Sequence, residues 1–131
     1  MKYFYCDSCF LITTYQEKYL GSLSQYKDQF FISNTQITEE LIRPANLAIA
    51  VRKAITVIED TEDIRIKTNE LVNKHCGLSK FDCLSLAFAI VDGYCLVTDD
   101  KHLTKIATCY GVVVKSSIDI INDFNLRKRG K

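Results

Sequence analysis

The chain contains 131 residues, of which 47% are hydrophobic and 25% are charged, a balance typical of globular proteins. This length allows one domain with a substantial core, and we expect a single domain over residues 1–131. The formal net charge of +1 indicates no class of partner. The last five residues, "RKRGK", are basic; such a tail can contact nucleic acid, but we expect a solvated, frayed end over about residues 125–131. The absence of a signal peptide and of an apolar run able to cross a bilayer favours a cytoplasmic protein with no membrane partner.

Short apolar strands alternate with helical segments along the first half of the chain. Aromatic and β-branched runs predict strands at residues 3–6, 30–33 and 55–59. Apolar residues at helical spacing predict helices at residues 10–25, 35–43 and 45–53, and Pro44 restarts the chain before the last of these.

The same alternation continues in the second half. Helices are predicted at residues 63–75, 79–91, 101–110 and 118–124, and strands at residues 94–98 and 112–114. Strands that alternate with helices indicate a parallel sheet covered on both faces. The expected fold class is therefore α/β, a three-layer α/β/α sandwich with a central parallel five-stranded sheet.

The six cysteines indicate a reduced protein. Cys6, Cys83 and Cys95 lie within apolar runs, where a free thiol packs as a small hydrophobe, so a reducing compartment fits better than a disulfide framework. Cys6 and Cys9 form a C-x-x-C string, but a zinc site would need a second ligand pair at similar spacing. The sequence shows no such pair, and we expect neither a zinc site nor a redox motif.

Acidic residues stand where a parallel sheet places its binding sites, beyond the carboxyl ends of the strands. Asp7 follows the first predicted strand, and Asp99 and Asp100 follow the fourth. Glu40 lies in the helix after the second strand, and Asp82 begins the helix before the fourth. Three or four carboxylates gathered together cannot all stay ionised without a cation between them. Oxygen ligands suit Mg²⁺ or Mn²⁺, which assist phosphoryl-transfer chemistry.

Each acid also has a purely structural interpretation, which we would favour if it stood alone. Asp7 and Asp100 can cap the helices that follow them. Glu39 and Glu40 can be first-turn acids that face the positive end of a helix dipole. Asp82 occupies the third helical position of a capping-box pattern. Only the expected convergence of these acids favours a metal site.

The order and spacing of these motifs resemble the PIN-domain nucleases along residues 3–121. The matching stretches are "YCDSCFLI", "ITEELI", "LSKFDCLSLAFA" and "LVTDDKHLTKIATCYGVVV". They correspond to a strand ending in Asp-Ser, a Glu followed by Leu, an L-S-x-x-D helix start, and T-x-D followed by a helix and a Gly-Val strand. The resemblance implies a compact α/β fold and a divalent-metal-dependent endoribonuclease that hydrolyses RNA phosphodiester bonds.

The resemblance also implies roles for particular residues. The acidic quartet would be Asp7, Glu40, Asp82 and Asp100, with Asp99 as an auxiliary metal ligand. The ion, Mg²⁺ or Mn²⁺, would be held by Asp7, Asp82 and Asp100, with Glu40 acting directly or through water. Glu39 stays open as an alternative to Glu40, because counting from the second strand favours it. Ser8 and Thr98 would be small hydroxyls that contact substrate. Apart from the resemblance, Lys80 and Lys101 flank the site in the sequence and can contact RNA phosphates, with plain solvated lysines as the alternative.

Small single-domain proteins of this family are often toxins of toxin–antitoxin pairs, which implies an antitoxin partner and a homodimer. A rival hypothesis is a catalytically silent module that keeps the acidic pocket for binding or regulation. Another α/β phosphoryl-transfer domain is disfavoured, because a haloacid-dehalogenase-type phosphatase needs Asp-x-Asp-x-Thr where this chain has "DSCFL". This chain also lacks the acidic pair near the first strand and the phospho-accepting Asp after the third that a receiver domain needs. Its five glycines are not arranged as a nucleotide-binding P-loop.

Overall fold

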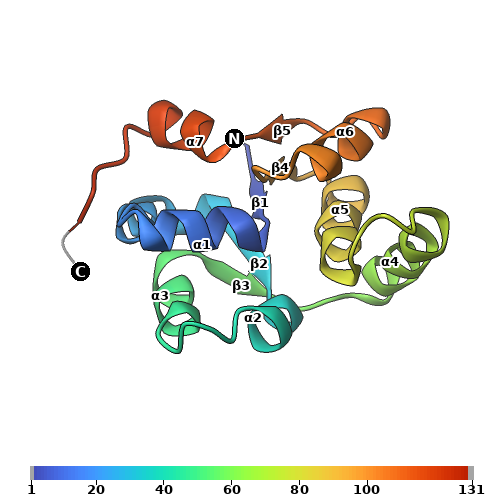
Figure 1. The fold of residues 1–131 in the computed structure, drawn as a ribbon, viewed down its shortest axis with the longest axis horizontal. Helices are drawn as coiled ribbons and strands as arrows, with labels where there is room; N and C mark the ends of the chain where they lie inside the picture. Colours follow the sequence, from blue (N-terminus) through green and yellow to red (C-terminus); the bar gives the residue numbers. More distant parts are fainter. Residues whose placement is uncertain (1, 130–131) are drawn as a thin grey trace.

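The computed structural model describes residues 2–129, in which strands and helices alternate along the chain (Figure 1). The strands are β1 (Phe4–Cys6), β2 (Phe30–Ser33), β3 (Thr56–Ile58), β4 (Cys95–Val97) and β5 (Val114–Lys115). The helices are α1 (Ser8–Gln16), the 3-10 segment η1 (Leu20–Gln29), α2 (Asn34–Glu40), α3 (Leu47–Ala54), α4 (Glu62–Lys74), α5 (Lys80–Asp92), α6 (Lys101–Cys109) and α7 (Ser117–Asp123). No helix in this part of the chain is long and apolar enough to cross a membrane.

Within residues 2–129, the strands form one five-stranded parallel sheet in the order β3-β2-β1-β4-β5. The central strand is β1, in which Tyr5 pairs with Phe31 of β2 on one side and with Leu96 of β4 on the other. From β1, the chain adds β2 and β3 on one side of the sheet and then β4 and β5 on the other. The carboxyl ends of β1 and β4 therefore border the topological switch point, where open α/β sheets bind their ligands.

Helices cover both faces of this sheet (Figure 1). On one side α1 packs with α3 and η1, and α7 contacts α1. On the other side α5 lies against β1 and β4, α4 packs on α5, and α6 contacts β5. The predicted three-layer α/β/α sandwich with a central parallel sheet is confirmed.

Aromatic side chains join the layers through the central strand. The Tyr5 ring stacks on Phe88 of α5 at a centroid distance of 4.7 Å, and the Phe4 ring stacks on Phe30 of β2 at 5.1 Å. Tyr5 is fully buried, so its hydroxyl needs a hydrogen-bond partner inside the protein. That partner belongs to the candidate site described below.

The single helix predicted over residues 10–25 is wrong. The helix α1 ends at Gln16, and the chain then turns at Lys18, whose backbone has a left-handed φ of 67°. The chain continues as the 3-10 segment η1, which includes Gly21, Ser22 and Ser24. Glycine and serine have lower helix propensity than alanine or leucine, so the apolar spacing of this segment did not suffice for a continuous α-helix.

The placement of Glu39 and Glu40 in a first helical turn is also wrong. The helix α2 starts directly after β2, where the Ser33 hydroxyl caps it by accepting a hydrogen bond from the Thr35 N–H. It ends at Glu40, three residues before the end of the predicted helix 35–43, so both acids lie in its last turn. A residue that precedes proline disfavours helical backbone, which is consistent with a helix that stops before Pro44.

The expected frayed tail is wrong for residues 126–129. Leu126 is buried, and the backbone N–H of Arg129 donates to the Lys18 carbonyl at 2.8 Å. The Ser22 hydroxyl donates a hydrogen bond to the Arg127 carbonyl. The segment after α7 is therefore held against the region where α1 ends and η1 begins. Residues 130–131 lie outside the described part of the chain.

Candidate functional site

Asp7 is held at the carboxyl end of β1 beside β4, because its backbone N–H donates to the Val97 carbonyl at 2.9 Å. It occupies the N-cap position of α1, but its side chain makes no capping hydrogen bond. Its Oδ2 instead accepts hydrogen bonds from Thr98 Oγ1 at 2.8 Å and from Cys9 Sγ at 3.1 Å, and Ser85 Oγ lies 3.5 Å from Oδ1. Asp7 therefore stands at the predicted N-cap position without capping through its side chain, and this buried carboxylate faces the switch point.

In the structure, neighbouring acids raise the pKa of two of the predicted site residues, Asp7 and Glu40. Burial raises the pKa of Asp7, hydrogen bonds from Cys9 and Thr98 lower it, and the charge of Asp82 raises it further. Burial likewise raises the pKa of Glu40, and the charges of Asp7 and Asp82 add to the increase. Neighbouring like charges have this effect because they disfavour the ionised form of each carboxyl group. Ser85 Oγ lies 3.5 Å from Asp7 Oδ1 and 3.4 Å from Gln36 Oε1, and Gln36 in turn donates to Glu40, so Asp7 and Glu40 lie on the same side of this network. We call Asp7, Glu40 and Asp82 the acidic cluster.

The structure places Glu40, and not Glu39, in this cluster. The half-buried Glu40 carboxylate accepts a hydrogen bond from Gln36 Nε2 at 3.0 Å. Glu39 is exposed, and its carboxylate lies 3.8 Å from Lys80 Nζ. The last turn of a helix carries the negative end of the helix dipole, so α2 does not offset the charge of Glu40.

A buried chain of hydrogen bonds leads from the sheet to Glu40. The Tyr5 hydroxyl accepts a hydrogen bond from the Ser33 N–H at 3.0 Å and donates one to Gln36 Oε1 at 2.6 Å. Ser85 Oγ also lies 3.4 Å from Gln36 Oε1. Because these donors occupy the amide oxygen, Gln36 presents its NH₂ group to Glu40. Sequence reasoning missed Tyr5, Gln36 and Ser85; the only available signal was the i,i+4 spacing of Gln36 and Glu40 on one helix.

Cys9 is a further site residue that sequence reasoning missed, having treated it only as part of the C-x-x-C string. Its Sγ lies 3.1 Å from Asp7 Oδ2 and 3.2 Å from Thr98 Oγ1. Burial, assisted by the charge of Asp7, raises the pKa of the Cys9 thiol to about 12. The thiol is therefore protonated at neutral pH and acts as a hydrogen-bond donor to Asp7, while Cys6 is buried in β1.

Asp82 combines a structural role with its place in the cluster. Its Oδ2 accepts a hydrogen bond from the Ser79 N–H at 3.2 Å, and its own N–H donates to Ser79 Oγ at 3.0 Å, which completes a capping box at the start of α5. The predicted capping box is therefore confirmed. Since this motif uses Oδ2, Asp82 can cap α5 and still present Oδ1 to the cluster.

Asp100 and Asp99 have different surroundings. Asp100 caps α6 by accepting a hydrogen bond from the Leu103 N–H at 2.9 Å, and its N–H donates to Thr98 Oγ1 at 3.1 Å. Thr98 thus links Asp100 to Asp7. Both carboxylate oxygens of Asp99 accept hydrogen bonds from Ser117, from its N–H and its hydroxyl, each at 2.7 Å. We assign Asp99 to anchoring the start of α7, and not to the auxiliary metal role expected from the sequence.

The predicted substrate-binding residues divide into two pairs. Thr98 and Ser8 are 2% and 8% exposed. The Thr98 hydroxyl holds Asp7, and the Ser8 hydroxyl hydrogen-bonds to Glu40, which opposes the increase in the pKa of that carboxyl group. Both therefore help to position the acids, and their expected contacts with substrate stay a prediction. Lys80 and Lys101 are exposed at the first positions of α5 and α6.

No lysine, arginine or histidine within residues 2–129 forms an ion pair with Asp7, Glu40, Asp82 or Asp100. In the same part of the chain, no three His, Cys, Asp or Glu side chains are already arranged as a metal site. The donors that are present are carboxylate oxygens in a partly buried cluster. This chemistry fits a hard divalent cation and does not suit a zinc-type site of nitrogen and sulfur ligands.

Comparison with solved structures identifies the fold. The chain is similar to PAE2754 from Pyrobaculum aerophilum, with a TM-score of 0.69 and 17% identity over 95% of this chain and 90% of that one. It is also similar to SSO1118, a PilT N-terminus domain protein from the hyperthermophilic archaeon Sulfolobus solfataricus, with a TM-score of 0.59 and 11% identity over 98% of each chain. No protein-family model and no curated protein sequence matches the chain.

The PilT N-terminus domain is the PIN domain, so the chain has the PIN-domain fold. This confirms, at the level of the fold, the resemblance seen in the sequence motifs. The acidic cluster of this chain lies at the carboxyl ends of the strands of that fold, beside the switch point between β1 and β4.

Proposed function

We propose that this protein is a divalent-metal-dependent endoribonuclease that hydrolyses RNA phosphodiester bonds. The observation that carries the proposal is the cluster of Asp7, Glu40 and Asp82 at the switch point, with no basic side chain paired to it in residues 2–129. Carboxylates that lie close together without a counter-charge form an electrostatically incomplete site. A cation with oxygen preference, Mg²⁺ or Mn²⁺, would complete it.

The residues that would hold the ion are Asp7, Asp82 and Asp100, with Glu40 acting directly or through water. When bound, such an ion supplies activation of water and neutralisation of charge on the phosphate. Residues of the chain itself orient the carboxylates. Thr98 and Cys9 fix the Asp7 carboxylate by donating to one of its oxygens, and Gln36 holds the Glu40 carboxylate by donating to Oε1.

The test of this function is cleavage of structured and unstructured RNAs with Mn²⁺, with Mg²⁺ and with a chelator, for the natural protein and for Asp82→Asn. An asparagine side chain retains an oxygen able to accept from the Ser79 N–H, so α5 stays capped. We expect metal-dependent cleavage and a loss of at least about 100-fold in Asp82→Asn, equivalent to about 2.7 kcal/mol of transition-state stabilisation.

The matched control is Glu39→Gln, which removes the same charge from an exposed carboxylate outside the cluster and should cleave like the natural protein. Metal-dependent cleavage that persists at full rate in Asp82→Asn would contradict the proposed mechanism.

A second candidate function is a catalytically silent binding or regulatory module. It is favoured by the observation that no three side chains in residues 2–129 are already arranged as a metal site. Thermal stabilisation by Mn²⁺ without cleavage of any RNA in the panel would support this function over the nuclease.

The support of Glu40 by Gln36 provides a separate prediction. Removal of a side chain that hydrogen-bonds to a metal ligand typically weakens metal affinity 10–100-fold. Gln36→Leu keeps a side chain of similar size but removes the N–H donor to Glu40. We expect its Kd for Mn²⁺, measured by the electron paramagnetic resonance signal of free Mn²⁺, to rise about 10-fold.

The control for this prediction is Gln16→Leu, which makes the same substitution at an exposed glutamine of α1 and should leave the Kd unchanged. A folded Gln36→Leu protein with the natural Kd for Mn²⁺ would show that Gln36 does not position the acid.

We extend the proposal to the biological setting that the resemblance implies, a toxin of a toxin–antitoxin pair in the cytoplasm, with an antitoxin that blocks the site and a homodimeric assembly. All six cysteines are free, which supports a reducing compartment. Co-expression with the product of an adjacent gene, followed by measurement of complex formation and of RNA cleavage, tests the antitoxin. Light scattering of the purified chain tests the dimer.

A further inference from the structure

A basic surface lies around the junction of α1, η1 and the end of the chain. It borders two adjoining hollows, of about 500 Å³ and about 490 Å³, and Arg129 lines both. The basic side chains that line these hollows are Lys18, Lys53, Arg127, Lys128 and Arg129. No acidic residue in the described part of the chain lines either hollow. We call these five residues the basic surface.

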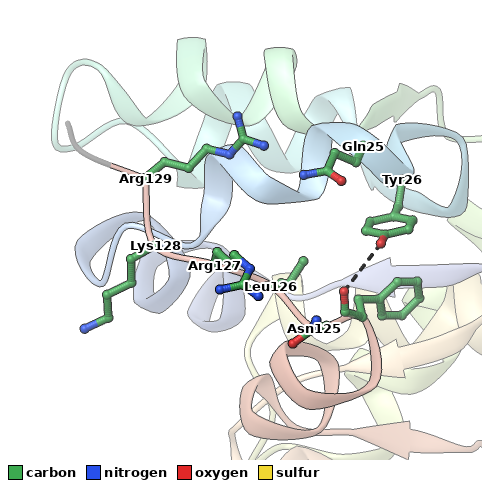
Figure 2. Close-up of a pocket in the computed structure, with 8 residues that line it drawn as sticks. Gln25, Tyr26, Asn125, Leu126, Arg127, Lys128 and Arg129 are labelled. Carbon is green, nitrogen blue, oxygen red and sulfur yellow. Dashed lines mark hydrogen bonds between the residues drawn. The ribbon is translucent and has the colours of Figure 1, made fainter.

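The backbone of the segment that carries Arg127, Lys128 and Arg129 is held in place. The Arg129 N–H donates to the Lys18 carbonyl at 2.8 Å, the Ser22 hydroxyl donates to the Arg127 carbonyl, and Leu126 is buried. Figure 2 shows the side chains of Arg127, Lys128 and Arg129 leaving this segment in different directions around the first hollow. The basic residues are therefore presented from a held segment, whereas a frayed tail would spread them over many positions.

The charge of the basic surface is not neutralised by the protein. None of its five residues forms an ion pair within residues 2–129. Arg129 Nε donates to Ser22 Oγ at 3.4 Å, and Lys128 Nζ lies 5.6 Å from the centre of the Tyr19 ring, so both contacts are with neutral groups. The whole chain has 17 basic and 16 acidic residues, so this local excess reflects segregation of charge. Such a surface attracts a polyanion.

The helix α1 connects this surface to the acidic cluster. It begins at Ser8, next to Asp7, and ends at Gln16, two residues before Lys18. A helix of 9 residues is about 14 Å long at a rise of 1.5 Å per residue. At about 3.4 Å per stacked nucleotide, this distance corresponds to roughly four nucleotides. An RNA strand that followed α1 from the acidic cluster would therefore reach the basic surface after a few additional nucleotides.

We propose that the basic surface binds the phosphate backbone of the RNA substrate, several nucleotides away from the bond that is cleaved. This inference rests on the proposed nuclease function. Lysine and arginine contacts with phosphates position a nucleic acid without reading its sequence, so the surface contributes affinity for longer RNAs of any sequence. Its contribution decreases with salt, because binding releases counterions from the RNA.

The test compares Arg127→Gln/Lys128→Gln with Lys74→Gln/Lys105→Gln, a control that removes the same charge from exposed positions of α4 and α6. Binding of a fluorescent 20-nucleotide RNA and of a tetranucleotide would be measured by anisotropy in chelator, between about 50 and 200 mM salt. We expect the double variant to bind the 20-mer about 10-fold more weakly, and the slope of log K against log salt to fall by about 1.4, or 0.7 for each lost phosphate contact. Binding of the tetranucleotide should not change.

The proposal would be overturned if Arg127→Gln/Lys128→Gln bound the 20-mer with the same affinity and the same salt slope as the natural protein. It would also be overturned if Lys74→Gln/Lys105→Gln lost as much affinity as that variant. Competition by poly-glutamate as strong as that by RNA at equal charge would overturn it in favour of an acidic protein partner. Cleavage of the tetranucleotide with Mn²⁺ is measured in parallel. If the natural protein cleaves nothing while the salt slope still falls in the variant, the basic surface stands and the nuclease function fails.

Discussion

Asp7→Asn is expected to abolish metal-dependent RNA cleavage and, at the same time, to stabilise the metal-free protein. Asp7 is only 3% exposed, and burial and the charge of Asp82 both raise the pKa of its carboxyl group. An ionised carboxylate in that position opposes folding, because it is desolvated and lies near two other acids. Asparagine keeps an oxygen that can accept from Thr98 and removes the charge.

We expect cleavage by Asp7→Asn to fall at least about 1,000-fold, equivalent to about 4 kcal/mol. The free energy of unfolding of the metal-free protein should rise by about 1 kcal/mol, which corresponds to roughly 4 °C in Tm for a chain of this size. Asp28→Asn is the control, because Asp28 is exposed in η1 and should change neither quantity. A destabilised Asp7→Asn protein, or one that cleaves RNA normally, would contradict this prediction.

The second large effect expected is a decrease in the stability of the metal-free protein as the pH rises above the ordinary pKa values of its buried acids. The pKa values of Asp7 and Glu40 are raised above their ordinary values of 3.8 and 4.5. Between its ordinary value and its raised value, each group binds more protons in the folded state than in the unfolded state. Stability therefore falls as pH rises through this interval. Asp119 has a lowered pKa, so its opposite contribution is lost only at lower pH, below its ordinary value of 3.8.

Tm would be measured by differential scanning fluorimetry across this pH range, in chelator and with Mn²⁺. We expect Tm in chelator to fall with pH and the fall to be smaller in Asp7→Asn. The increase in Tm caused by Mn²⁺ should grow with pH, because the cation competes with protons for the carboxylates. Parallel curves for the natural protein and Asp7→Asn would show that the acidic cluster does not control this dependence.

The fold was largely predictable because its signals are local. Runs of aromatic and β-branched residues such as "YFYC" and "FFIS" define the strands, and apolar residues at helical spacing define most helices. The alternation of the two element types then leaves few arrangements besides a parallel sheet covered on both faces. The position of Asp7 and Asp100 after two strands also follows from the sequence, because the side of the sheet on which a residue lies depends only on strand direction.

Which carboxylate serves which role was decided by tertiary structure. Asp7, Asp82 and Asp100 all stand at helix starts, and local sequence predicts a cap at each. Asp82 and Asp100 do cap their helices, whereas Asp7 is held by Thr98, which is 91 residues away in the chain. The adjacent Glu39 and Glu40 face different directions on α2, so that Glu40 is half-buried beside Gln36 and Glu39 is exposed.

By itself, the sequence determined the α/β architecture, the strand ends at which the acids lie and the family that their spacing resembles. Only the tertiary structure decided that Gln36 and Tyr5 support Glu40, that Asp99 anchors α7 and that the basic segment docks on η1. The physical reason is the range of the interactions. Helix and strand patterns arise between residues a few positions apart, whereas these contacts join residues up to 105 positions apart and exist only after the layers have packed.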